Sequence, residues 1–233
     1  GSNIKGEAAG DNSGYSVSLS SDGNIVAIGG TYNDGNGTNA GHVRVFNNTN
    51  GSWTQIGSDI DGTNANDYFG RSVSLSSDGN TLAIGANGEV NNANDTSYVR
   101  VFKNSNGSWT QIGSDIYGEA LGDNSGKSIS LSSDGITLAI SAYRNDGNGS
   151  DAGHARVYKN INGTWTQIGS DIDGEAARDY FGFFLSLSSD GNTLAVSTPY
   201  NDGNGTDAGH VRVYSLCNST STDTITSCNS YTW

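Results

Sequence analysis

The feature that most constrains this 233-residue chain is a motif that returns every 56 residues. Asp22, Asp78, Asp134 and Asp190 each follow two serines and precede a glycine. Self-similarity at a fixed period indicates a repeat architecture, in which each unit buries its apolar surface against its neighbours. The sequence therefore predicts one repeat domain over 1–216, with units at 1–56, 57–112, 113–168 and 169–216, and a tail at 217–233.

Each unit contains short apolar runs bounded by turn residues. In the first copy we expect strands at 15–20, 25–29, 42–47 and 52–56, with a tight Asp-Gly hairpin joining the first two. Four antiparallel strands per repeat are typical of a propeller blade, and no segment has apolar residues at helical spacing. The predicted fold class is all-β: a β-propeller of four-stranded antiparallel blades, with a β-sandwich or another β-repeat array as the alternative.

The composition limits the partners of the chain. Only 33% of the residues are hydrophobic, but they keep fixed positions in every copy, which argues against disorder. A formal net charge of −13 excludes nucleic acid and disfavours anionic membrane surfaces, since both bind cationic proteins. No apolar run is long enough for membrane insertion. The chain begins with Gly1 and has no methionine, so we expect a piece of a larger protein.

Two cysteines, Cys217 and Cys228, lie in the tail. Two cysteines alone do not make a zinc site, so a short-loop disulfide in an oxidising compartment is the favoured interpretation, with a pair of free thiols as the alternative. The tail either supplies the last outer strand or begins a following module. Four blades are few for a closed ring, so further blades could belong to the parent protein or to a second chain.

The loop between the second and third expected strands suggests a calcium site. Oxygen-bearing side chains alternate there with glycines that let the backbone curl, which suits a hard cation. The alternative is an Asx-rich turn whose side chains bond their own backbone. The second copy replaces this loop with 87–97. The candidate ligands are Asp34, Asn36, Thr38, Asp146, Asn148, Ser150, Asp151, Asp202, Asn204, Thr206 and Asp207.

Other polar and aromatic residues recur at equivalent positions. Tryptophans 53, 109 and 165 could stack on sugars, but packing between blades is favoured, with each indole N–H bonded to a backbone oxygen. Histidines 42, 154 and 210 are interpreted as structural hydrogen-bonding residues. The acid pairs 7 and 11, 119 and 123, and 175 and 179 are interpreted as turn residues rather than catalytic carboxylates. Repetition of this kind argues against a unique active site, so we expect no enzyme.

Several segments resemble the FG-GAP repeats of the integrin α-subunit propeller and of many bacterial surface proteins. The matching segments are DYFGRSV at 67–73, DYFG at 179–182, LAIGA at 82–86 and GHVRVF at 41–46. Copies one and three depart from this pattern, with Asn-Ser-Gly at 12–14 and 124–126. Residues 223–233 look like the opening of another bacterial surface repeat. The resemblance implies a propeller, a cell-surface setting, an adhesive or ligand-binding role, and calcium in the loops.

Together these observations predict a non-enzymatic binding or adhesion module of a larger cell-surface or secreted protein. The expected location is extracellular, and the expected partner is a protein or glycan at a cell surface, or another copy of the chain. A structural spacer or filament subunit is the first alternative, because exposed edges of terminal blades can pair with neighbouring chains. A carbohydrate-binding lectin is the second. Calcium is the only cofactor suggested by the residues.

Overall fold

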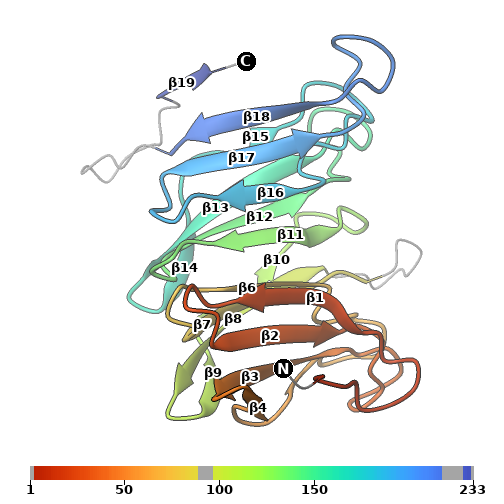
Figure 1. Cartoon of the computed structure of the whole chain (residues 1–233). Helices are drawn as coiled ribbons and strands as arrows, with labels where there is room; N and C mark the ends of the chain where they lie inside the picture. Colours follow the sequence, from red (N-terminus) through yellow and green to blue (C-terminus); the bar gives the residue numbers. More distant parts are fainter. Residues whose placement is uncertain (1–2, 89–96, 217–227, 232–233) are drawn as a thin grey trace.

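The computed structural model describes residues 3–88, 97–216 and 228–231, and its regular elements are β-strands (Figure 1). The strands form four antiparallel sheets, which confirms the predicted all-β propeller blades. The first sheet contains β1 (Ser13–Leu19), β2 (Ile25–Gly30), β3 (His42–Thr49), β4 (Ser52–Gln55) and β5 (Ile60–Asp61). The second contains β6 (Ser72–Leu75), β7 (Thr81–Ala86), β8 (Tyr98–Ser105), β9 (Ser108–Gln111) and β10 (Ile116–Tyr117).

The remaining sheets repeat the same order. The third contains β11 (Ser125–Leu131), β12 (Thr137–Ala142), β13 (His154–Ile161), β14 (Thr164–Gln167) and β15 (Ile172–Asp173). The fourth contains β16 (Leu185–Leu187), β17 (Thr193–Thr198), β18 (His210–Ser215) and β19 (Cys228–Tyr231), the last of which pairs with β18 from the tail. Among the described residues, no helix is long and apolar enough to cross a membrane.

A short fifth strand in three of the sheets was not predicted. β4 pairs only with the half of β3 from Phe46 to Thr49, which leaves the backbone at His42 and Val43 available. β5, from the beginning of the next repeat, pairs with these two residues. Unpaired backbone groups in a buried strand are costly, so the chain satisfies them before it crosses to the next blade.

The Asp-Gly hairpin between β1 and β2 forms as predicted. Asp22 Oδ1 accepts hydrogen bonds from the Ser20 hydroxyl at 2.6 Å and from the Asn24 N–H at 3.0 Å. Gly23 has a φ of 72°, which glycine adopts without strain. These bonds stabilise the ionised carboxylate, the Ser20 bond most of all, and lower the pKa of Asp22 to about 2.

Neighbouring blades pack face to face through apolar cores and serine hydrogen bonds. One core joins the first blade to the second, and two more join the later pairs. The backbone N–H of Leu75 donates to Ser18 Oγ of the preceding blade at 2.9 Å, and the equivalent bonds recur at 3.0 and 2.9 Å. Because β7 and β12 lie between two neighbouring blades, they are apolar and buried on both faces. β2 of the first blade is also apolar on both faces, as predicted, but Val26 and Ile28 pack with Ile4 and Trp53 of the same repeat.

The Tyr-Phe-Gly turns connect neighbouring blades through a buried phenylalanine side chain and a backbone hydrogen bond. Phe69 and Phe181 are fully buried, and the Phe69 N–H donates to the Ala40 oxygen of the preceding blade at 3.0 Å. Tyr68 has a φ of 51°. Its counterpart Asn12 has a φ of 52°, so the Asn-Ser-Gly copies keep the left-handed turn with a residue that tolerates it better.

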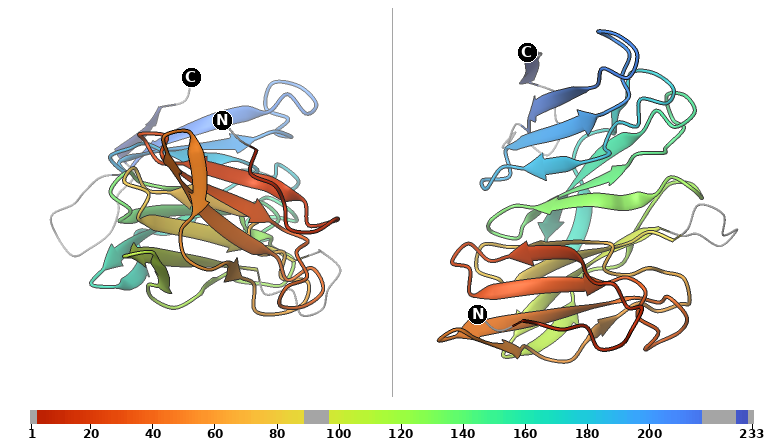
Figure 2. Two further views of the ribbon diagram at one scale, coloured as in Figure 1. Left: turned by 60° about the horizontal axis from the view of Figure 1, so that its bottom comes forward. Right: turned by 45° about the vertical axis from the view of Figure 1, so that its right-hand side comes forward.

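The arc of blades is open, with the first and fourth sheets at opposite ends (Figure 2). Leu19 on the first blade is 58% exposed, whereas its counterpart Leu75, covered by a preceding blade, is 7% exposed. Val211 on the fourth blade is 62% exposed, whereas its counterpart Val43 is 0% exposed. Each end therefore presents a face of the kind that is buried between blades.

Candidate functional site

The residues predicted to bind calcium lie in the loops that join the second and third strands of three blades. The loops at 31–41, 143–153 and 199–209 follow β2, β12 and β17 and lie along one side of the molecule, at the right in Figure 1. Asp34, Asp146 and Asp202 occupy equivalent positions, and all three side chains are exposed. The fold thus places the predicted acidic residues in three separate loops that face the same side.

Hydrogen bonds within each loop form Asx turns. Asp34 Oδ1 accepts the Asn39 N–H at 2.8 Å, and the same bond to the residue five positions on recurs in the third and fourth blades. Asn33 Oδ1 accepts the Gly35 N–H at 2.9 Å. This geometry is that of the Asx-rich turn, in which side chains bond the loop's own backbone, which was the alternative to a calcium site.

Other predicted ligands connect the loop to the following repeat. Asn36 donates its side-chain N–H to the Gly62 oxygen at 2.7 Å. Asn148, two blades later, makes the same bond to the Gly174 oxygen at 2.7 Å. The backbone oxygen of Thr38 accepts the Asn66 N–H at 2.8 Å. In the part of the chain that the structure describes, the loop acids join no group of three histidine, cysteine or acidic ligands within 4.8 Å. Calcium binding here stays a prediction.

Two histidine–carboxylate clusters lie elsewhere, and sequence reasoning missed them. The first consists of Glu7, His42 and Asp59, and the second of Glu119, His154 and Asp171. His42 Nδ1 lies 3.7 Å from Glu7 Oε2 and 3.5 Å from Asp59 Oδ2, and in the second cluster these distances are 3.8 and 3.5 Å. The signal available in the sequence was that all three residues return 112 positions later.

The hydrogen-bonding role predicted for the histidines is not seen at Nδ1 of His42 or His154. His42 and His154 are each 1% exposed, and Nδ1 of both rings has no hydrogen-bond partner among the described residues. Burial, and next the adjacent Arg156 cation, lower the pKa of His154, whereas Asp171 and Glu119 oppose the shift. Each histidine instead turns Nδ1 toward two carboxylate oxygens.

The second blade replaces the cluster with different contacts. Tyr98 stands at the histidine position and donates its hydroxyl to Asp67 Oδ2 at 2.8 Å. Arg100 binds both oxygens of Asp115, at 2.8 and 2.9 Å, and its third nitrogen donates to Thr63 Oγ1 at 2.7 Å. Burial, and next the charge of Asp67, raise the pKa of Tyr98 above its usual value.

The acids at 11, 123 and 179 are turn residues, as the sequence predicted. Asp11 Oδ2 accepts the Ala8 N–H at 3.0 Å and the Asn33 side-chain N–H at 3.2 Å. The bonds of the third and fourth blades match these. Each acid thus fixes the loop of its own repeat against the segment that enters the blade.

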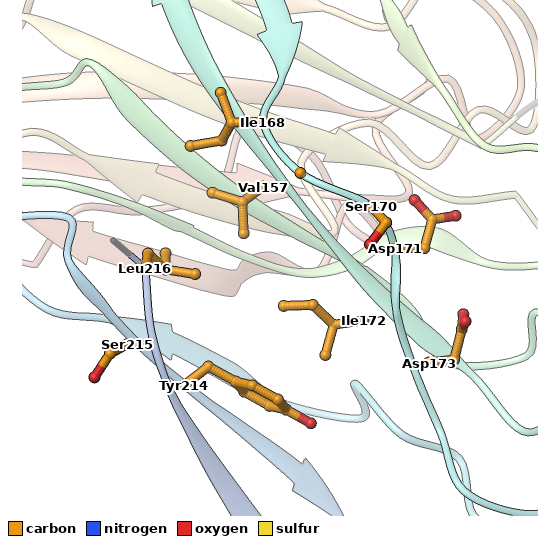
Figure 3. A pocket seen from close by; sticks show the side chains of 10 residues that line it. Val157, Ile168, Ser170, Asp171, Ile172, Asp173, Tyr214, Ser215 and Leu216 are labelled. Carbon is orange, nitrogen blue, oxygen red and sulfur yellow. The ribbon is translucent and has the colours of Figure 1, made fainter. Parts of the chain in front are cut away.

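Two hollows border the clusters. One, of about 330 Å³, lies between the third and fourth blades, where Val157, Ile168 and Leu216 gather in Figure 3. The other, of about 460 Å³, is lined by the segment 57–61 and by Trp109. Asp171 belongs to the first lining and Asp59 to the second. Both linings contain aspartate and serine side chains, and the first also contains Tyr214.

The tryptophans pack against the blade cores. Trp109 lies against the core between the first and second blades, and its Nε1–H donates to the Ile56 oxygen at 3.1 Å. Trp165 lies against the next core. The prediction of packing is confirmed at both tryptophans. The predicted backbone partner for the indole is confirmed at Trp109, but it is wrong at Trp165, whose Nε1 is buried without a hydrogen-bond partner among the described residues. Cys217 and the side chain of Cys228 fall outside the described residues, so their disulfide stays a prediction.

Comparisons with known proteins agree with this architecture. Residues 60–102 match the FG-GAP repeat family. The chain is a β-propeller repeat protein, and this one stretch of it is similar to an FG-GAP repeat. No curated protein matches it.

Several solved structures share the fold of this propeller protein. A candidate 6-phosphogluconolactonase from Bacteroides uniformis has 16% identity and a TM-score of 0.58, over 87% of this chain and 50% of that one. Hydrazine synthase from Kuenenia stuttgartiensis has 17% identity and a TM-score of 0.53, over 88% and 51%. Sqt1 from Saccharomyces cerevisiae has 15% identity and a TM-score of 0.51, over 88% and 45%. The chain spans about half the length of these structures.

Proposed function

We propose that this propeller is a non-enzymatic binding or adhesion module of a larger cell-surface or secreted protein. The observation that carries the proposal is the row of exposed Asx loops on one side of the blades. Loops held by a rigid sheet scaffold are common places for binding residues. Equivalent groups repeated from blade to blade suit contact with an extended protein or glycan better than they suit one catalytic centre.

The charge of these loops indicates the chemistry of the partner. Asp34, Asp146, Asp202 and Asp207 are exposed on the loop side, within a chain of net charge −13. A cationic surface would meet these carboxylates favourably, and salt would screen the attraction between exposed charges. We therefore expect binding through the loops to weaken as ionic strength rises.

Binding of the labelled chain to a printed array of extracellular proteins and to a glycan array tests this function. We expect retention on basic extracellular proteins that falls several-fold between about 50 and 200 mM salt and falls again in a D34N/D146N/D202N variant. Asp22→Asn, on a hairpin away from the loops, is the matched control. Retention on glycans alone would favour the lectin alternative, and retention on neither array would count against a binding module.

Calcium in the loops forms part of the same proposal. An ion that binds only the folded chain must raise its thermal midpoint. Millimolar calcium should therefore stabilise the metal-stripped chain more than magnesium does, and the loop variant should lose that difference. An equal response to both ions would leave the three loops as Asx turns without a metal.

A structural or assembly subunit is the second candidate, and the open end faces favour it. Leu19 and Val211 lie on the opposite end faces, and each matches a residue that is buried between blades. A face of this kind on one chain could cover the other face on a second chain, which makes a head-to-tail contact. Such contacts close into rings or extend into filaments.

Sedimentation velocity over a hundredfold range of concentration tests this assembly. An assembling chain should sediment faster as its concentration rises, and Val211→Asp should abolish the change because it places a charge in the contact. Val17→Asp should do the same from the first blade, where Val17 is 64% exposed. A sedimentation coefficient that stays constant would reject the assembly function and leave the binding proposal intact.

A further inference from the structure

The two histidine–carboxylate clusters have the geometry of metal sites. We propose that Glu7, His42 and Asp59, and likewise Glu119, His154 and Asp171, bind a divalent transition metal ion such as zinc. In each cluster the three ligand atoms lie within 4.8 Å of one another. Zinc bonds of about 2.0–2.2 Å place neighbouring ligand atoms roughly 3–4 Å apart, so modest closure around an ion completes the set.

The histidine is the group that points to a ligand. His42 is 1% exposed, and its Nδ1 has no hydrogen-bond partner among the described residues. A buried polar atom without a partner is costly, and this one faces two carboxylate oxygens at 3.5 and 3.7 Å. His154 repeats the arrangement. Imidazole nitrogen with two carboxylates is a donor set that suits zinc.

Neighbouring residues hold the carboxylates in place. Gln55 donates to Asp59 Oδ1 at 2.6 Å, which leaves Oδ2 toward the histidine. Arg44 lies 3.4 Å from Glu7 Oε1, while Oε2 faces the histidine. Gln167 and Arg156 repeat these contacts in the second cluster. Partners that hold the second atom of a ligand in this way are typical of metal sites.

Charge and access also suit a divalent ion. Two carboxylates and one arginine give the cluster a net charge of −1 when the histidine is neutral, so an ion of charge +2 is attracted. Glu7 is 44% exposed and Asp59 27% exposed, so an ion can enter from solvent and water can complete its coordination. Asp59 also lies in the lining of the 460 Å³ hollow.

The second blade shows what this position looks like when it is built for a structural contact. Its aspartate, Asp115, has both oxygens bound by Arg100, and tyrosine and threonine replace the histidine and glutamate. That arrangement leaves no open donor set. At this position, the second blade therefore has side chains that pair with one another, whereas the two clusters have three ligand atoms that face one another. The inference concerns the clusters only and does not depend on the partner proposed for the loops.

Isothermal titration of the metal-stripped, tag-free chain with zinc tests the proposal. We expect about two zinc ions per chain, and about one after His42→Tyr or His154→Tyr. The double variant should bind none. Tyrosine is the residue that the second blade carries at this position, so the variants are compatible with the fold. His210→Tyr is the matched control and should leave two ions bound.

The isosteric pair Asp59→Asn and Asp171→Asn gives a second measurement in case a tyrosine variant fails to fold. Cobalt serves as a spectroscopic probe, and its visible absorption should report nitrogen and oxygen ligands in the wild type and disappear in D59N/D171N. Zinc stoichiometry that stays at two in the double variants would overturn the assignment. Absence of zinc binding to the wild type would also overturn the assignment and would leave each cluster as a buried histidine beside two carboxylates.

Discussion

Replacing Phe69 by alanine should lower the free energy of unfolding by about 3–5 kcal/mol. Phe69 is fully buried in the core between the first two blades, and its ring lies edge-on to Phe102 with the centroids 6.4 Å apart. The backbone around it leaves little room to collapse, because Gly41 and Gly62 already pack closely against this turn. Truncation therefore leaves a cavity as well as removing apolar contact.

Urea unfolding followed by tryptophan fluorescence measures this effect. Phe184→Ala is the matched control: the side chain is 60% exposed, so we expect a change of at most about 0.5 kcal/mol. Phe181→Ala, the equivalent of Phe69 two repeats later, should match Phe69→Ala because Phe181 is also fully buried. Equal losses for Phe69→Ala and Phe184→Ala would mean that the Tyr-Phe-Gly turn does not join the blades.

Much of the fold follows from the period and from turn chemistry. The Asp-Gly hairpin and the four main strands of the first copy begin and end within two residues of their predicted limits. Such features depend on local sequence. The pairing of Ile60 with Val43 was not predictable in the same way, because it depends on which half of β3 its other neighbour leaves free.

The site was harder to predict because its members come from separate parts of each repeat. Glu7 precedes the first blade, His42 begins β3, and Asp59 belongs to the segment leading into the next repeat. Nothing in their sequence spacing shows that these side chains converge. The Asx loops were easier to recognise, since their residues are consecutive, but whether they bind calcium depends on oxygen positions that composition does not determine.

Because the propeller is open at both ends, truncating the same leucine should destabilise an inner blade much more than the first blade. Leu75→Ala should lower the free energy of unfolding by about 2–4 kcal/mol, whereas Leu19→Ala should cost less than about 1 kcal/mol. The two leucines hold the same place in the repeat, but Leu75 is covered by the preceding blade and Leu19 is 58% exposed. Urea unfolding at micromolar concentration compares them directly. The same urea unfolding at a hundredfold higher protein concentration also tests assembly. A second chain that covered the first blade would raise the loss of unfolding free energy for Leu19→Ala toward that for Leu75→Ala. Equal costs at low concentration would contradict the view that burial between blades, rather than the strand itself, makes this leucine stabilising.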